Sequence, residues 1–124
     1  MLPQVYEKIE DGRYTIEVAL TITHDGIMIF IEGGDKPHIG TVVVSQPRLS
    51  MKGDLSLSCT TSVINRLSHM DDIIIIPIAE AICKKTNAFV VASGGVHIDE
   101  VGDDGIKRIM SNMEQIIKRV LARL

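Results

Sequence analysis

The sequence predicts an α+β fold, in which one mostly antiparallel sheet carries two helices on one of its faces. Four segments with strand patterns precede the first helical pattern, and a fifth apolar segment lies between two stretches of helical period. The resulting order, β-β-β-β-α-β-α, lacks the strict alternation of strands and helices found in a doubly wound parallel sheet. A chain of 124 residues can bury one core but not two, so we expect a single domain over residues 1–124.

The first two predicted strands form a hairpin. Residues 13–23 alternate between apolar and polar side chains, which is typical of a strand with one covered face. His24-Asp25-Gly26 supplies a turn, and residues 27–31 return as a second strand. Because this second strand is apolar on both faces, we expect it near the centre of the sheet.

Two more strands follow before any helix. Residues 41–45 predict the third strand, which Gln46-Pro47 is expected to end. Residues 54–63 alternate again, and their period assigns one set of side chains to the covered face. That set is Leu55, Leu57, Cys59, Thr61 and Val63. The outer faces of the first and fourth strands are rich in serine and threonine. These side chains could line a polar groove, meet water or meet a second subunit. Together with the small size of the chain, they lead us to expect a homo-oligomer.

The rest of the chain changes to helical spacing. Asp71 or Asp72 can cap a first helix, whose regular part is expected to begin near Pro77 because proline is tolerated only in an early turn. Residues 88–93 are apolar at nearly every position and predict a buried strand, which a loop over residues 94–102 follows. The final helix opens at Asp103 and Asp104, and its apolar stripe is Ile106, Ile109, Met110, Met113, Ile116 or Ile117, Val120, Leu121 and Leu124.

Composition excludes several classes of function. A net charge of −3 and an aromatic content of 3% argue against nucleic-acid binding, which needs a basic face or stacking rings. The apolar runs are far shorter than the ~20 residues of a membrane span, and no targeting segment is visible. We therefore expect a cytoplasmic protein with no membrane partner. Cys59 and Cys83 form no Cys-x-x-Cys motif and are predicted to be buried thiols.

Two short segments have the most irregular chemistry in the chain. Gly33-Gly34-Asp35-Lys36-Pro37-His38-Ile39-Gly40 interrupts two apolar strands, and Ser93-Gly94-Gly95-Val96-His97-Ile98-Asp99 repeats a glycine pair followed by His-Ile. Glycine permits a close approach of backbone or a positive φ, and lysine and histidine offer polar contacts. Two segments of such similar composition suggest one shared site.

Anion binding requires the fewest assumptions about these segments. The backbone amides of Gly33-Gly34 or Gly94-Gly95 could hold a phosphate or another oxyanion, with Lys36 or Arg48 as the counter-charge.

The histidines leave two other kinds of chemistry open. His38 and His97 could act as an acid and a base in a small hydrolase or isomerase, because histidine titrates near neutral pH. A metal site would combine His38, His69 and His97 with Asp71 or Asp99. No His-x-His or His-x-x-x-His spacing supports it, so we predict no bound metal.

Three motifs occur in a recognisable order. They are Gly33-Gly34-Asp35-Lys36-Pro37-His38-Ile39-Gly40-Thr41-Val42, then Ser68-His69-Met70-Asp71-Asp72 before a helix, then Gly95-Val96-His97-Ile98-Asp99. In order and spacing they resemble the small accessory proteins of gallate decarboxylase, a family described as prenylated-flavin chaperones, and the resemblance runs from about Tyr14 to the last helix. It implies a non-catalytic cytoplasmic protein that binds prenylated FMN, or FMN, and assists its delivery to, or oxidative maturation in, a prenylated-flavin-dependent decarboxylase.

The resemblance also implies a cofactor site at the matching positions. These are Gly33, Gly34, Pro37, His38, Ile39, Gly40, His69, Asp71, Gly95, His97 and Ile98, to which the anion hypothesis adds Lys36 and Gly94. Two alternatives to this function stay open at the level of sequence. One is the acid–base enzyme described above, and the other is a structural protein whose glycine segments form an oligomer interface and bind no small molecule.

Overall fold

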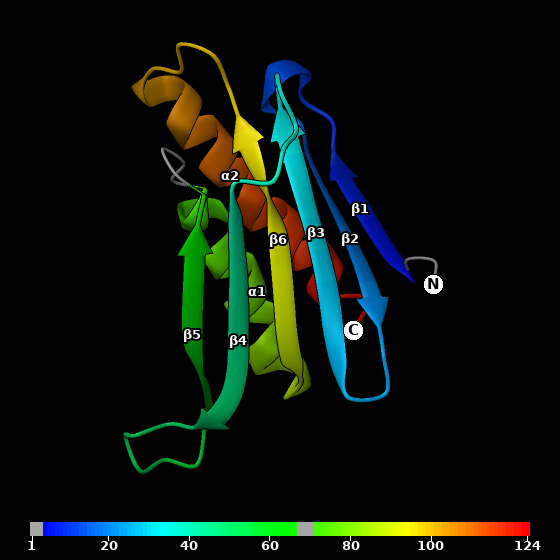
Figure 1. Ribbon diagram of the computed structural model, residues 1–124, viewed down its shortest axis with the longest axis vertical. Coiled ribbons are helices and arrows are strands. Elements are labelled where there is room, and N and C mark those ends of the chain that lie inside the picture. Colours follow the sequence, from blue (N-terminus) through cyan, green and yellow to red (C-terminus); the bar gives the residue numbers. More distant parts are fainter. Residues whose placement is uncertain (1–3, 67–70) are drawn as a thin grey trace.

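The computed structural model describes residues 4–66 and 71–124, and these residues form a six-stranded sheet with two α-helices behind it (Figure 1). The elements in chain order are β1 (Val5–Ile9), a 3-10 turn η1 (Gly12–Tyr14), β2 (Ile16–Ile22), β3 (Gly26–Gly34), β4 (Thr41–Leu49), β5 (Leu57–Asn65), α1 (Asp72–Thr86), β6 (Phe89–His97) and α2 (Asp103–Leu121). The order across the sheet is β1-β2-β3-β6-β4-β5, and every neighbouring pair is antiparallel except β3 and β6. The predicted α+β fold with both helices on one face is confirmed.

Strand β1 was not predicted. Its segment contributes two buried apolar side chains, Val5 and Ile9, and it becomes a strand by pairing with β2 and packing under α2. The residues expected to start the next strand at Arg13 form η1 instead, so β2 begins at Ile16. Pairing with β2, rather than the local sequence pattern, makes this edge segment a strand.

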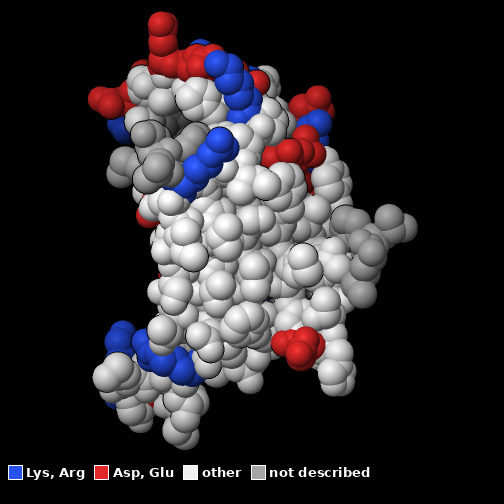
Figure 2. Space-filling model, viewed as in Figure 1, with Lys and Arg blue, Asp and Glu red and all other residues white. Residues whose placement is uncertain are grey.

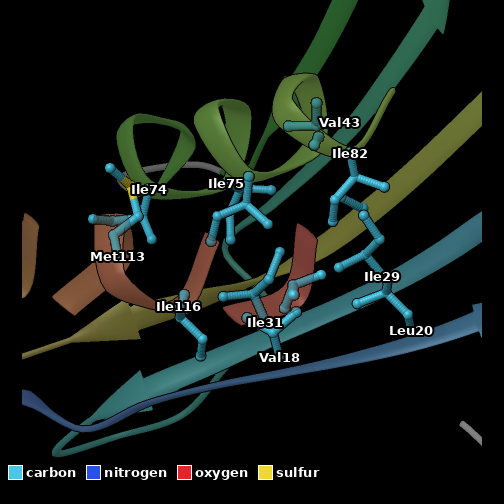
Figure 3. Close-up of a cluster of buried hydrophobic side chains, with 14 of the residues drawn as sticks. Val18, Leu20, Ile29, Ile31, Val43, Ile74, Ile75, Ile82, Met113 and Ile116 are labelled. Atoms are coloured by element: carbon cyan, nitrogen blue, oxygen red, sulfur yellow. The ribbon is translucent and has the colours of Figure 1, made fainter. Parts of the chain in front are cut away.

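One layer of apolar side chains between the sheet and the helices forms the core (Figure 3). The sheet contributes Val18, Leu20, Ile29, Ile31 and Val43, α1 contributes Ile74, Ile75 and Ile82, and α2 contributes Met113 and Ile116. The alternation predicted for β2 and the helical spacing predicted for α1 therefore both point at this layer. On the other side of the sheet, β3 carries exposed apolar residues, because no helix lies there.

Replacing Ile75 by valine is expected to lower the free energy of unfolding by about 1 kcal/mol, because a buried methyl-sized group is lost and the site only partly collapses. Ile75 is 0% exposed. Ile73 offers a matched control on the same helix, since it is 55% exposed, and Ile73→Val should change the free energy by less than about 0.5 kcal/mol. Urea denaturation followed by circular dichroism measures both values, and equal costs would contradict the assignment of the buried face.

Prolines fall inside two elements where the sequence predicted a boundary. Strand β4 does not end at Gln46-Pro47 but continues to Leu49. Beyond Ser45 it has β5 as a neighbour but no longer β6, and a strand with one free side accepts proline. Helix α1 begins at Asp72 rather than near Pro77. The missing amide hydrogen of Pro77 would have bonded the carbonyl of Ile73, an exposed residue in the first turn of the helix.

Strand β5 is an edge strand that the helices cover only in part. It spans Leu57–Asn65 rather than residues 54–63. Of the side chains predicted to face inward, Cys59 is buried, whereas Leu55, Leu57 and Val63 are exposed. The register places Leu57, Cys59 and Val63 on the helix side, as expected. The prediction was therefore right about which side chains face the helices and wrong about how much of the strand the helices cover.

The two cysteines are buried and unbridged, as predicted. Burial raises the pKa of both the Cys59 and the Cys83 thiol. Within residues 4–66 and 71–124, neither helix is long and apolar enough to cross a membrane.

Candidate functional site

Most of the predicted site residues that the structure describes gather at the end of the sheet where β3 and β6 both stop. Gly33 and Gly34 are the last residues of β3, and the connection through residues 35–40 leads to β4. The second glycine segment was expected to be a loop, but β6 continues through it to His97. In the parallel register, Gly34 lies opposite His97, so the two segments are adjacent strand ends.

Close packing of the backbone explains these strand glycines. Gly94 has φ +143°, and a Cβ placed there would lie 1.7 Å from the carbonyl oxygen of Ile31. A Cβ at Gly33 would lie 2.3 Å from the carbonyl oxygen of Thr15. No side chain fits at either position without parting neighbouring strands.

The amide of Gly34, which was expected to bind an anion, and the amide of Gly40 both donate to backbone carbonyls. The amide of Gly34 donates to the carbonyl of Thr15 at 3.1 Å, and the amide of Gly40 donates to the carbonyl of Gly94 at 2.8 Å. Asp35 and Lys36 both donate their amides to the carbonyl of His97. An anion held by the amide of Gly34 therefore lacks a physical basis, and the glycines serve another purpose.

One role of the glycines is to leave room for the contact between His38 and Asp71. His38 Nε2 lies 2.9 Å from Asp71 Oδ2, and Asp71 is 7% exposed at the start of α1. The other carboxylate oxygen accepts the amide hydrogen of Val96 at 3.1 Å, where β6 continues beyond Thr41, the first residue of β4. A Cβ at Gly95 would lie 2.8 Å from His38 Nε2, and one at Gly40 would lie 1.7 Å from Asp71 Oδ2. The pair fits because both positions lack a side chain.

Both ring nitrogens of His38 lie next to an oxygen atom. Nδ1 lies 2.9 Å from the carbonyl oxygen of Lys36, and Nε2 lies 2.9 Å from Asp71 Oδ2. The carbonyl can only accept a hydrogen bond, and which ring nitrogen donates depends on the tautomer of His38. The two contacts together fix the orientation of the ring.

His97 stands beside this pair. The centroids of the His38 and His97 rings are 6.0 Å apart, and the rings meet edge to face at 76°. His97 Nε2 lies 2.9 Å from Asp99 Oδ1, and its side chain is 45% exposed. The histidines of the two glycine segments therefore come together, His38 in a partly buried position and His97 open to solvent.

A network of charges surrounds the histidines, and sequence reasoning missed most of it. Arg13 contacts Asp35 at 2.8 Å, and Lys36 contacts Asp99 at 3.5 Å. A hydrogen bond from the Asp99 amide, together with the adjacent Arg13 guanidinium, holds the pKa of the Asp35 carboxyl below its usual value. The bond to His97, with Lys36 nearby, likewise lowers the pKa of Asp99. Arg13 lies 22 positions before Asp35, and no local pattern links them.

Other predicted residues have less definite places. Lys36 is 69% exposed, and Pro37 and Ile39 are exposed on the same connection. Arg48 lies at the far end of β4, where its Nε donates to Thr60, so it is not the counter-charge proposed from sequence. His69 falls outside the described residues. Among residues 4–66 and 71–124 there is no group of three His, Cys, Asp or Glu side chains that could hold a metal ion.

An apolar pocket of about 190 Å³ opens next to Asp71. Its walls come from the start of α1, the end of β6 and the first turns of α2, and they include Ile73, Val96, Ile106 and Met110. Asp71 therefore both contacts His38 and lines an apolar cavity.

A larger hollow of about 560 Å³ lies at the opposite end of the sheet. Turn residues such as His24 and Asn87 line it, and it contains no residue of the three motifs. We place the candidate site at the histidines, because there the charged and titratable side chains converge.

Comparison with known proteins gives one family and one fold. Residues 10–124 match the family described as the prenylated flavin chaperone LpdD-like domain. No curated protein matches the chain. The chain is similar to a solved structure described as the crystal structure of a novel chaperone complex for yeast 20S proteasome assembly, with 18% identity and a TM-score of 0.53, over 98% of this chain and 94% of that chain. At that identity the likeness concerns the fold alone.

Proposed function

The chain belongs to the prenylated flavin chaperone family, and we propose that it binds prenylated FMN in the cytoplasm and passes it to a prenylated-flavin-dependent decarboxylase. The observation that carries the proposal is the convergence of His38 and His97, with ring centroids 6.0 Å apart, beside the apolar pocket.

The polar half of this site suits the heteroatoms of a flavin. His97 is braced by Asp99, and its exposed ring can stack on, or donate to, the ring system. His38 is held from both of its nitrogens and fixes the position of the neighbouring ring. Lys36 extends into solvent at the same end of the sheet and is the cation best placed for a phosphate.

The apolar half suits the hydrocarbon part of the cofactor. Ile73, Ile106 and Met110 line the pocket next to Asp71, and none of the three carries a charge. At about 190 Å³ the pocket is smaller than the ~300–1,000 Å³ of sites that enclose a whole ligand. The cofactor would therefore stay partly exposed, which suits a protein that has to release it.

Binding of reduced prenylated FMN under anaerobic conditions is expected to weaken at least tenfold in His97→Ala and in His38→Ala. Each change removes one of the two adjacent rings, and a tenfold loss corresponds to about 1.4 kcal/mol. Equilibrium dialysis with detection of the flavin by absorbance measures the dissociation constants. Circular dichroism of each variant establishes that it is folded.

His24→Ala is the matched control for this titration. His24 is an exposed histidine in the turn between β2 and β3, and it lines the hollow at the opposite end of the sheet. We expect His24→Ala to bind like the wild type. If His24→Ala loses binding while His38→Ala and His97→Ala keep it, the ligand occupies that hollow and the proposed site is wrong.

Transfer is tested with an apo decarboxylase that depends on prenylated FMN. The loaded chain should restore decarboxylation faster than the same concentration of free cofactor, and the unloaded chain should restore none. Equal rates for loaded chain and free cofactor would refute a role in delivery while leaving binding intact.

A further inference from the structure

The face of the sheet opposite the helices has no covering layer in the described chain (Figure 1). We call it the open face and define it by six apolar side chains that the register places there: Met28, Phe30, Val42, Val44, Ile64 and Val91. Small and hydroxyl-bearing side chains such as Ala19 and Ser93 lie between them. Met28 is 59% exposed and Ile64 is 74% exposed.

The middle of the open face is uncharged. Along one row, β2 to β5 present Ala19, Phe30, Ser93, Val42 and Ile64, and the next row is equally free of charge. Figure 2 shows the same region as a white area with acidic and basic side chains toward the ends of the strands. Strands that meet water on one face usually carry polar side chains there, and parallel neighbours such as β3 and β6 are usually covered on both faces. The pattern is that of a face built to be covered.

The open face has the size of a stable interface. The six strands lie about 4.8 Å apart, and their five to nine residues rise about 3.3 Å each, so the whole helix-free side of the sheet, charged ends included, covers on the order of 800 Å². A standard specific interface buries about 800 Å² on each partner.

We infer that the open face binds the open face of a second copy of this chain, so that two sheets stack between two outer layers of helices. Two sheets with the same twist stack aligned at about 30°, as in a β-sandwich. A two-fold interface must be complementary to itself, and the uncharged middle of the open face meets that condition because it does not repel its own copy. Glu17 and Glu32 lie on the same side of the sheet but toward the histidine end.

Charges at the rim of the open face support the same partner. Asp25, in the turn between β2 and β3, and Arg48, near the end of β4, lie at the same end of the sheet on opposite sides of the central β3–β6 pair. A two-fold axis parallel to the strands therefore places Arg48 of one copy across from Asp25 of the other. The same axis puts the histidine sites of both copies at one end of the dimer.

Sedimentation equilibrium of the full chain without flavin tests this inference separately from the proposed function. The expected mass at about 10–100 µM is twice the 13.6 kDa of the chain. Met28→Lys buries a charge in the interface and is expected to weaken the dimer at least a hundredfold. Met51→Lys is the matched control, because Met51 is 91% exposed in the loop between β4 and β5, and it should stay dimeric.

Further variants keep the test decisive. Should Met28→Lys fail to fold, Val42→Lys on the same face is expected to give a folded monomer. Asp25→Arg and Arg48→Asp should each weaken the dimer, and the double variant should restore it if the axis is parallel to the strands. A monomeric wild type at 100 µM, or a Met28→Lys chain as dimeric as the wild type, would overturn the inference. A monomer whose open face instead binds the decarboxylase would overturn it too.

Discussion

Replacing Gly94 by alanine is expected to lower the free energy of unfolding by about 4 kcal/mol, through backbone strain and overpacking of about 2 kcal/mol each. Gly94 has φ +143°, which side-chain-bearing residues rarely adopt. The added methyl group would meet the carbonyl oxygen of Ile31 at 1.7 Å, and that oxygen belongs to the central strand β3. Relief requires β3 and β6 to separate. Guanidinium denaturation followed by circular dichroism measures the cost.

Gly53→Ala separates the two causes of this loss. Gly53 also has a positive φ, +75°, but a Cβ there would meet nothing within 4 Å. Its cost should therefore be limited to the backbone term, about 1 kcal/mol. If Gly94→Ala costs no more than Gly53→Ala, the close approach of β3 and β6 is not what requires glycine at position 94.

The same glycines explain where prediction of the fold from sequence failed. Glycine pairs at 33–34 and 94–95 end strand patterns by local rules, so both segments were assigned to loops. In the structure each pair lets the backbone of the other strand approach, and β6 extends to His97 opposite Gly34. A mutual requirement of two segments about 60 residues apart leaves no mark on the local period. Helices α1 and α2 were easier to predict from the sequence, because their apolar stripes repeat over several turns.

The candidate site was likewise predicted only in part from the sequence. His38 and His97 were predicted to meet from composition alone, since both follow glycine pairs at strand ends, and the structure brings their rings together. The residues that brace them were harder to find. Arg13 reaches Asp35 from the 3-10 turn before β2, a contact that exists only because β2 and β3 pair in this register. Tertiary pairing, rather than residue type, places such partners.

The sequence left open what the outer face of the sheet contacts, and strand order is the physical reason. Serine and threonine lie on β2 and β5, which flank the central strands. The central strands β3, β6 and β4 place Met28, Val91 and Val44 in one row between them. Polarity of this face depends on the order of strands across the sheet, which the sequence did not reveal.

Replacing Asp71 by alanine is expected to lower the free energy of unfolding by about 3 kcal/mol. The change removes the acceptor for the amide of Val96 and the partner of His38 Nε2 in a site where Asp71 is 7% exposed. Leaving a buried donor unpaired costs about 1–3 kcal/mol, and loss of the His38 contact adds about 1 kcal/mol. Urea denaturation at pH 7 measures the loss, and binding of prenylated FMN should weaken because His38 is no longer held.

Asp71→Asn is the matched variant, and it distinguishes the role of the Asp71 hydrogen bonds from that of its carboxyl group. Its side-chain oxygen can still accept from Val96, and its amide nitrogen can donate to Nε2 of a neutral His38, so the unfolding free energy should change by less than about 1 kcal/mol. The carboxyl group, however, is gone. If Asp71 serves only to hold His38 in place, Asp71→Asn binds the cofactor with the affinity of the wild type. If the carboxyl group itself acts on the ligand, Asp71→Asn stays folded but loses affinity. An Asp71→Asn variant as unstable as Asp71→Ala would contradict the assigned hydrogen bonds.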